Sequence, residues 1–164
     1  MYPCTRVGID YFDNAPSLFR AVVEIKATPA QIFSCFEDAD SWPQWAPPIQ
    51  KVEWTSEKPY DVGTTRRVSM TGRLVGDEVF IAWDYPQRMA FCFTHSSQGL
   101  IDSFAEDYQV TPLDNGLTRV QWTMGMTPKG IGRLTMKLSG PMMRFGLQWM
   151  LNRFKKHVEQ RFPG

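Results

Sequence analysis

Six segments of alternating apolar and polar residues restrict the fold of this chain more than any other feature. They cover residues 49–55, 64–71, 74–83, 88–95, 102–111 and 117–126, and turn-forming residues such as Gly72 and Asp114-Asn115-Gly116 stand between them. Alternation places one face of a strand against a core, and short connections join antiparallel neighbours. The pattern therefore predicts an antiparallel meander.

A seventh strand and two short helices precede the meander. Alternation from Leu18 to Ala27 predicts a half-buried strand. Thr28 is then placed as a helix N-cap, with Pro29 in the first turn and Gln31 completing a capping box. Prolines at 43, 47 and 48 prevent this helix from running on, so a pair of short helices is expected.

The C-terminal segment has the pattern of one long amphipathic helix over residues 141–161. Its apolar positions fall on one face, and the Gly140-Pro141 pair is expected either to start this helix or to kink a longer one. Residues 1–16 are expected to form an irregular arm, and residues 17–162 a single domain.

Composition excludes several classes of protein. The net charge is +1, which gives no overall field for nucleic acid, and no window approaches the roughly 20 apolar residues of a membrane span. Cys4, Cys35 and Cys92 are an odd and widely spaced set, as expected of reduced thiols. Without a signal peptide pattern at the start, a cytoplasmic location is expected.

Five stretches carry a resemblance to a known family: VVEIKATPAQIF, DADSWPQW, VGTTRRV, WDYPQRMAF and LNRFKKHVE. Over residues 18–160 the chain resembles the START-like, Bet v 1-like (SRPBCC) superfamily, in particular its polyketide cyclase/dehydrase and lipid-transport group. The resemblance implies an α+β helix-grip fold, in which a curved seven-stranded antiparallel sheet wraps around the long C-terminal helix. It also implies a hydrophobic pocket between sheet and helix.

Strand parity gives a candidate lining for that pocket. Taking the more apolar face of each strand as the inner one, and adding the long helix, the candidate ligand-binding residues are Trp45, Met70, Val79, Ile81, Trp83, Phe91, Phe93, Phe104, Tyr108, Trp122, Met124, Met143 and Leu147. Trp45 either lines the pocket or, with Trp42, closes the small end of the core.

The same parity leaves five polar residues on the inner face: Arg66, Asp77, His95, Asp102 and Glu106. If the turns centre where their residues suggest, His95 faces both Asp77 and Asp102. A histidine held by a carboxylate can transfer protons, and an arginine can hold an enolate or carboxylate group. Arg66, His95 and Glu106 are therefore the candidate catalytic residues. The alternative is that these groups form the solvated rim of the sheet.

Two functions follow from these expectations. The first is binding of a lipid, isoprenoid or polyketide-like molecule by a carrier or sensor, and the alternative is a polyketide cyclase or dehydratase. Cyclases of the group are thought to use pocket arginine, tyrosine and tryptophan, which Arg66, Tyr108 and Trp122 match in type. Two histidines and three scattered cysteines give no metal-ligand spacing, and no cofactor motif occurs. A homodimer or an acyl-carrier partner stays open.

Overall fold

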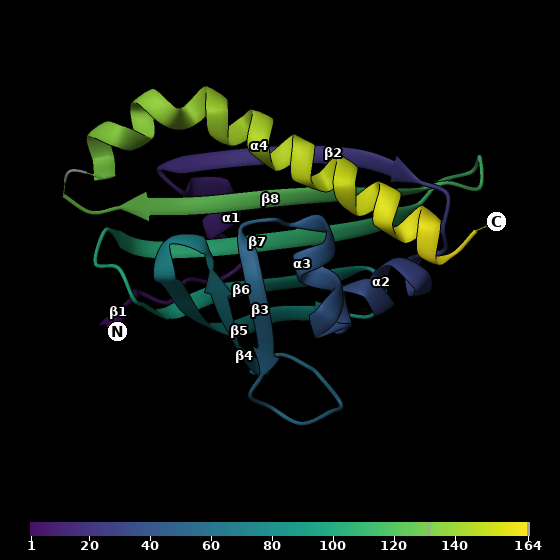
Figure 1. Cartoon of the computed structure of the whole chain (residues 1–164), viewed down its shortest axis with the longest axis horizontal. Coiled ribbons are helices and arrows are strands. Elements are labelled where there is room, and N and C mark those ends of the chain that lie inside the picture. The colour runs from purple at the N-terminus through teal and green to yellow at the C-terminus, as the bar shows by residue number, and fades with distance from the viewer. Residues whose placement is uncertain (131, 164) are drawn as a thin grey trace.

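The computed structural model describes residues 1–130 and 132–163, with side chains for all of these except 132–139. Its main element is one antiparallel sheet with the strand order β2-β8-β7-β6-β5-β4-β3 (Figure 1). These strands are β2 (Ser17–Ile25), β3 (Ile49–Trp54), β4 (Thr65–Met70), β5 (Leu74–Asp84), β6 (Arg88–Ser96), β7 (Ile101–Pro112) and β8 (Thr118–Pro128). The predicted seven-stranded sheet is therefore confirmed, and a two-residue strand β1 (Tyr2–Pro3) pairs with β6.

Two short helices follow β2 as the sequence predicts. Helix α2 (Pro29–Glu37) begins at the expected capping box, in which Thr28 and Gln31 each bind the backbone N–H of the other. A 3₁₀ turn η1 (Ala39–Ser41) leads into α3 (Trp42–Trp45), and a second 3₁₀ turn η2 (Thr71–Arg73) joins β4 to β5. Together, α2 and α3 close one end of the sheet (Figure 1).

The long C-terminal helix α4 (Gly132–Arg161) packs along β2 and β8 and reaches α2 and α3. It contains Pro141, so the longer of the two predicted helices is the one that forms. Leu147, Leu151, Phe154 and Val158 face the sheet and are buried, as the heptad-like spacing requires. Figure 1 shows α4 crossing the face of the sheet that we call the inner face.

A smaller apolar cluster covers the outer face of the sheet. Helix α1 (Tyr11–Asn14) places Phe12 against Ala90, Cys92 and Ala105, so part of the predicted irregular arm is a folded cover. The arm also reaches the far end of β6 and β7. There Pro3 lies opposite His95, and Thr5 donates its N–H to the Asp102 carbonyl (2.8 Å).

Two β-bulges change which side chains of β5 and β6 face inward, and the predicted alternation is wrong beyond them. In β5 the register shifts between Phe80 and Ala82, so Val79 and Ile81 pack with the outer cluster while Phe80 and Trp83 belong to the inner core. In β6 the register shifts at the pair Asp77–His95. Because a bulge inserts one unpaired residue, alternation counted along the strand fails beyond it.

The predicted pairing of His95 with both aspartates is half correct. Asp77 does lie opposite His95, but the pairing between β6 and β7 ends at Cys92 and Ala105. Asp102 is bound instead by Thr5 of the arm and by Lys129 (3.0 Å). Asp102 therefore contacts the N-terminal arm and Lys129 instead of His95.

Candidate functional site

A buried ion pair lies at the centre of the inner face. Arg66 on β4 donates to the carboxylate of Glu78 on β5, directly across the hairpin that η2 closes. Only 1% of the Arg66 surface and 4% of the Glu78 surface are exposed. Burial raises the pKa of Glu78, and the Arg66 charge opposes this rise. Such a pair is stable only while both partners are present, since either charge alone would be buried without compensation.

Aromatic rings surround the Arg66 guanidinium. Its central carbon lies 4.3 Å from the ring centroid of Trp42 and 4.5 Å from that of Phe91, with Trp54 and Phe80 at 5.5 and 5.2 Å. Faces of aromatic rings attract cations, and the attraction is stronger away from water. Trp42, which α3 carries, therefore covers the buried arginine, and its indole N–H is bound by the Phe36 carbonyl (2.9 Å).

A second buried carboxyl lies on β7. The Tyr108 hydroxyl donates to Glu106 across 2.7 Å, and both residues project from the same face of the strand. Burial raises the pKa of Glu106 to about 8, and the hydrogen bond from Tyr108 only partly opposes it. Burial and the neighbouring Glu106 raise the pKa of Tyr108 well above its ordinary value. At neutral pH Glu106 is therefore a neutral carboxylic acid with a proton to donate.

Three buried N–H groups around these residues have no hydrogen-bond acceptor in the described part of the chain. They are the indole nitrogens of Trp45 and Trp122 and the Nη1 atom of Arg66. The Trp122 indole comes near the Glu106 carboxyl and helps to lower its pKa without reaching hydrogen-bond geometry. Buried donors are normally paired, so these three N–H groups are exceptions that need an explanation.

The apolar side chains on this face are buried, most deeply toward one end of β8. Along β8 the exposed fraction falls from 8% at Met126 and 7% at Met124 to 3% at Trp122 and zero at Val120. On β7, Phe104 lies opposite Met126 and is half-buried, and Glu106 lies opposite Met124. Phe104 and Met126 lie at the end of the inner face where β8 leads into α4.

Most of the predicted lining lies on the inner face. Trp45, Phe91, Tyr108, Trp122, Met124 and Leu147 belong to the main core, with Met70, Trp83, Phe104 and Met143 half-buried against it. Phe93 packs on Phe104, with 4.5 Å between ring centroids. Trp45 is fully buried, with its ring against those of Trp122 and Phe154. Val79 and Ile81 are the two exceptions, as described above.

The candidate catalytic set is only partly brought together. Arg66 and Glu106 lie on the inner face, but His95 is exposed, and its ring nitrogen lies 3.3 Å from the Thr94 hydroxyl. Asp77 pairs with the exposed Arg67, whose charge holds the pKa of that carboxyl down. The ionisable residue beside Arg66 is therefore Glu78, which strand parity did not identify, and not His95. The position of the Gly72 turn could have predicted this contact, because a hairpin centred on Gly72 pairs position 66 with position 78.

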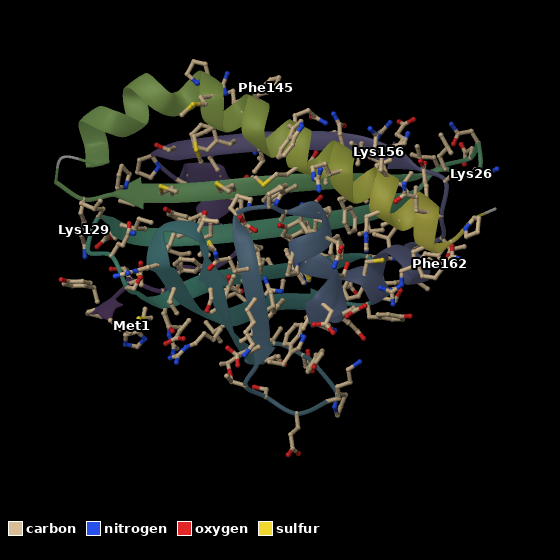
Figure 2. The ribbon with its side chains drawn as sticks, in the orientation of Figure 1. Met1, Lys26, Lys129, Phe145, Lys156 and Phe162 are labelled. Atoms are coloured by element: carbon tan, nitrogen blue, oxygen red, sulfur yellow. The ribbon has the colours of Figure 1, made fainter. Side chains whose placement is uncertain are left out.

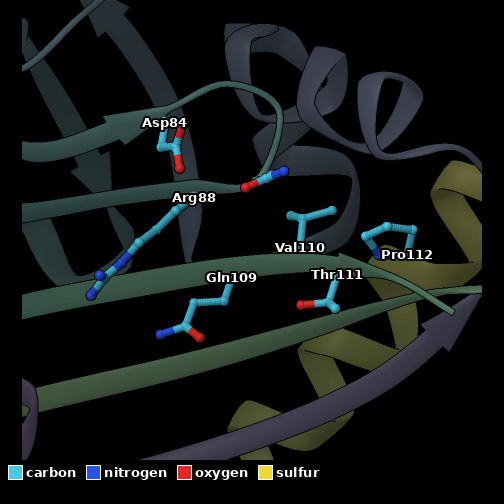
Figure 3. Close-up of a pocket in the computed structure, with 7 residues that line it drawn as sticks. Asp84, Arg88, Gln109, Val110, Thr111 and Pro112 are labelled. Atoms are coloured by element: carbon cyan, nitrogen blue, oxygen red, sulfur yellow. The ribbon is translucent and has the colours of Figure 1, made fainter.

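The surface hollows include a polar groove and an aromatic cleft. A groove of about 340 Å³ runs between the β5–β6 turn and the end of β7 (Figure 3). Its Arg88 and Gln109 side chains already donate hydrogen bonds to the Asp107 carboxylate. An aromatic cleft of about 650 Å³ is lined by Glu37, Lys58, Pro59, Tyr60, Trp83 and Tyr85. Its Glu37 and Lys58 already form an ion pair with each other (3.0 Å).

In residues 1–130 and 140–163, no three His, Cys, Asp or Glu side chains gather as a metal-binding group. No helix in the described part of the chain has the length and apolar character needed to cross a membrane. The groups available for chemistry on the apolar inner face are the neutral acid Glu106, the phenol of Tyr108 and the guanidinium of Arg66.

An antiparallel sheet gripping a long C-terminal helix, with a mixed apolar and polar inner face, defines the helix-grip class of START-like and Bet v 1-like proteins. Residues 18–161 match the model of the polyketide cyclase/dehydrase and lipid transport family, and the chain belongs to that family. It is 41% identical over 162 residues to the uncharacterised protein Rv2574 of Mycobacterium tuberculosis, covering 99% of this chain and 96% of that one.

Two solved structures share the fold. One is the Zhui aromatase/cyclase of Streptomyces sp. R1128, with a TM-score of 0.69 and 13% identity over 88% of this chain and 94% of that chain. The other is a START superfamily protein of Mycobacterium smegmatis, with a TM-score of 0.64 and 17% identity over 88% and 95%. At these identities the likeness concerns the fold.

Proposed function

We propose that this protein binds an apolar small molecule that carries a hydrogen-bond acceptor, between the inner face of the sheet and α4. The observation that carries the proposal is the buried neutral acid Glu106, with half-buried Phe104 beside it on β7 and the unpaired indole N–H of Trp122 near its carboxyl. An apolar ligand entering at Phe104 and Met126 would contact methionines, whose flexible side chains adapt to different shapes. Its far end would meet buried polar groups.

The buried polar groups determine which functional group an apolar ligand should carry. Tyr108 occupies one oxygen of Glu106, which leaves the acid proton free to donate, and the Trp122 N–H lies near the same carboxyl. Two donors at one place suit a carbonyl or hydroxyl oxygen. The charge of Arg66 is already neutralised by Glu78, so these buried polar groups have little net charge with which to bind an anion. We infer that a ketone or an alcohol is favoured over a carboxylate.

Matched probes test this assignment. The wild type is expected to bind 2-acetylnaphthalene more tightly than 2-ethylnaphthalene, measured by titration calorimetry. Trp122→Phe keeps an aromatic ring but removes the N–H, so it should weaken ketone binding by about 3–10-fold, the size of one hydrogen bond. Hydrocarbon binding should change little.

Trp149→Phe is the matched control, because it makes the same exchange at a residue 46% exposed on the outer side of α4. It should leave the binding of both probes unchanged. The assignment is wrong if the wild type binds neither probe, or if Trp122→Phe weakens both probes equally.

The pKa of Glu106 favours a second candidate function, a cyclase or dehydratase. A group with a pKa of about 8 holds its proton at neutral pH and can release it to a developing alkoxide or leaving hydroxide. In that case turnover of a poly-β-ketone mimic by the wild type should fall by about 100-fold or more in Glu106→Gln, with ketone binding retained. Binding without any turnover above buffer in the wild type would rule out the enzyme.

A further inference from the structure

An apolar stripe runs along the outer side of α4. Met142, Phe145 and Trp149 are 70%, 74% and 46% exposed. Spacings of three and four residues place these side chains on one face of the helix, opposite Leu147 and Leu151, which are buried against the sheet. A contiguous apolar stripe on an exposed helix marks an interaction site rather than a scatter of single residues.

A basic hollow continues the stripe toward the C-terminus. It has a volume of about 250 Å³ and is lined by Gln44, Arg153, Lys156, His157 and Gln160. The Arg153 guanidinium lies 5.2 Å from the Trp149 ring centroid, which joins the hollow to the stripe. Arg153 also donates to the carbonyls of Gln44 and Trp45, so its position is fixed.

The charge of this face has no internal counterpart. Within the described side chains, neither Arg153 nor Lys156 forms an ion pair with a carboxylate. Figure 2 shows Phe145 and Lys156 along the same outer side of α4, away from the sheet. An amphipathic helix with exposed aromatic and methionine side chains beside Lys and Arg fits the boundary of an anionic bilayer.

We propose that the outer face of α4 docks on membranes that contain anionic phospholipids. Met142, Phe145 and Trp149 enter the boundary between headgroups and acyl chains, and the basic hollow receives a headgroup phosphate. A second copy that packs through the same face fits poorly, because Arg153 and Lys156 of both copies would be brought together without carboxylates from that face. The proposal is independent of the ligand site, since the stripe lies on the side of α4 opposite the inner face.

The neighbouring edge of the sheet is covered by a side chain at its middle. On the edge strand β2, the backbone N–H and C=O of Val22 are both bound by the Gln148 side-chain amide (3.2 and 3.0 Å). Val22 itself is 42% exposed and extends the apolar surface beside the stripe. At this position the edge therefore presents side chains rather than free backbone groups to a partner.

Vesicle flotation tests the proposal. The full chain should float with vesicles of phosphatidylcholine and phosphatidylglycerol, and more weakly with phosphatidylcholine alone or in high salt. Phe145→Glu should weaken binding to the mixed vesicles about tenfold, because a buried aromatic is replaced by a charge. Lys156→Glu should weaken it about fivefold or more and reduce its dependence on salt.

Val62→Glu is the matched control. Val62 is 60% exposed in the loop between β3 and β4, at the far side of the molecule from α4 (Figure 1), and its substitution should leave flotation unchanged. Thermal melts and light scattering accompany each variant. The proposal is overturned if the wild type fails to prefer anionic vesicles, if Phe145→Glu floats like Val62→Glu, or if Phe145→Glu instead dissolves a dimer that does not bind vesicles.

Discussion

Glu106 is a residue whose protonation is set by its surroundings. Its ordinary pKa is 4.5, and burial beside Tyr108 raises this to about 8. Between these two values the folded protein holds a proton that the unfolded chain releases. The free energy of unfolding therefore decreases as pH rises through this interval, by about 5 kcal/mol for this one group. Above pH 8 the loss is complete, and the group adds no further dependence on pH.

Glu106→Gln should remove this dependence, because glutamine resembles the protonated acid and does not titrate. We expect the variant to match the wild type near pH 5 and to be more stable than it at pH 8.5, in urea unfolding measured at both values. Parallel stability curves for the two proteins would show that Glu106 ionises normally in the fold.

Arg66 and Glu78 form a pair whose members depend on each other. Arg66→Met should destabilise the protein by about 3–5 kcal/mol, since it leaves the Glu78 carboxyl buried without its cation. Adding Glu78→Gln should recover much of that loss, and a double-mutant cycle measures the coupling. A loss below about 1 kcal/mol in the single variant would contradict a buried, charged pair.

At the scale of the elements, alternation and turn residues were enough to place each strand to within a few residues. The capping box at Thr28 likewise located the start of α2. The bulges in β5 and β6 were not predictable, because one inserted residue leaves the local pattern of apolar residues almost unchanged while reversing every side chain beyond it. This is why Val79 and His95 were assigned to the wrong face.

Gly76 is the residue of β5 that admits Phe93 to the inner face. A Cβ atom there would lie 2.5 Å from the Phe93 ring, so Gly76→Ala should cost about 1–3 kcal/mol of stability and shift that ring. Gly146→Ala is the control, because no atom lies within 4 Å of its added Cβ, and it should be neutral or stabilising. Equal effects in thermal melts would contradict the close contact between β5 and Phe93.

For the whole molecule, the family resemblance predicted the fold, and the structure adds how the two sides of α4 differ. The inner side meets the sheet and its buried carboxyl group on Glu106, and the outer side carries an apolar stripe with a basic hollow. The composition could not reveal that hollow, because a net charge of +1 hides a local excess of cations on one helix.

Native mass spectrometry tests the central claim, that an apolar ligand occupies the inner face. The wild type, purified from the organism that encodes it, should carry the added mass of one small apolar molecule. Met124→Trp should lose that mass because the larger ring fills the inner face, whereas Met142→Trp, the same exchange on the outer side of α4, should retain it. A wild type that shows only the mass of the bare chain, and that takes up neither naphthalene probe when these are added, would contradict the account.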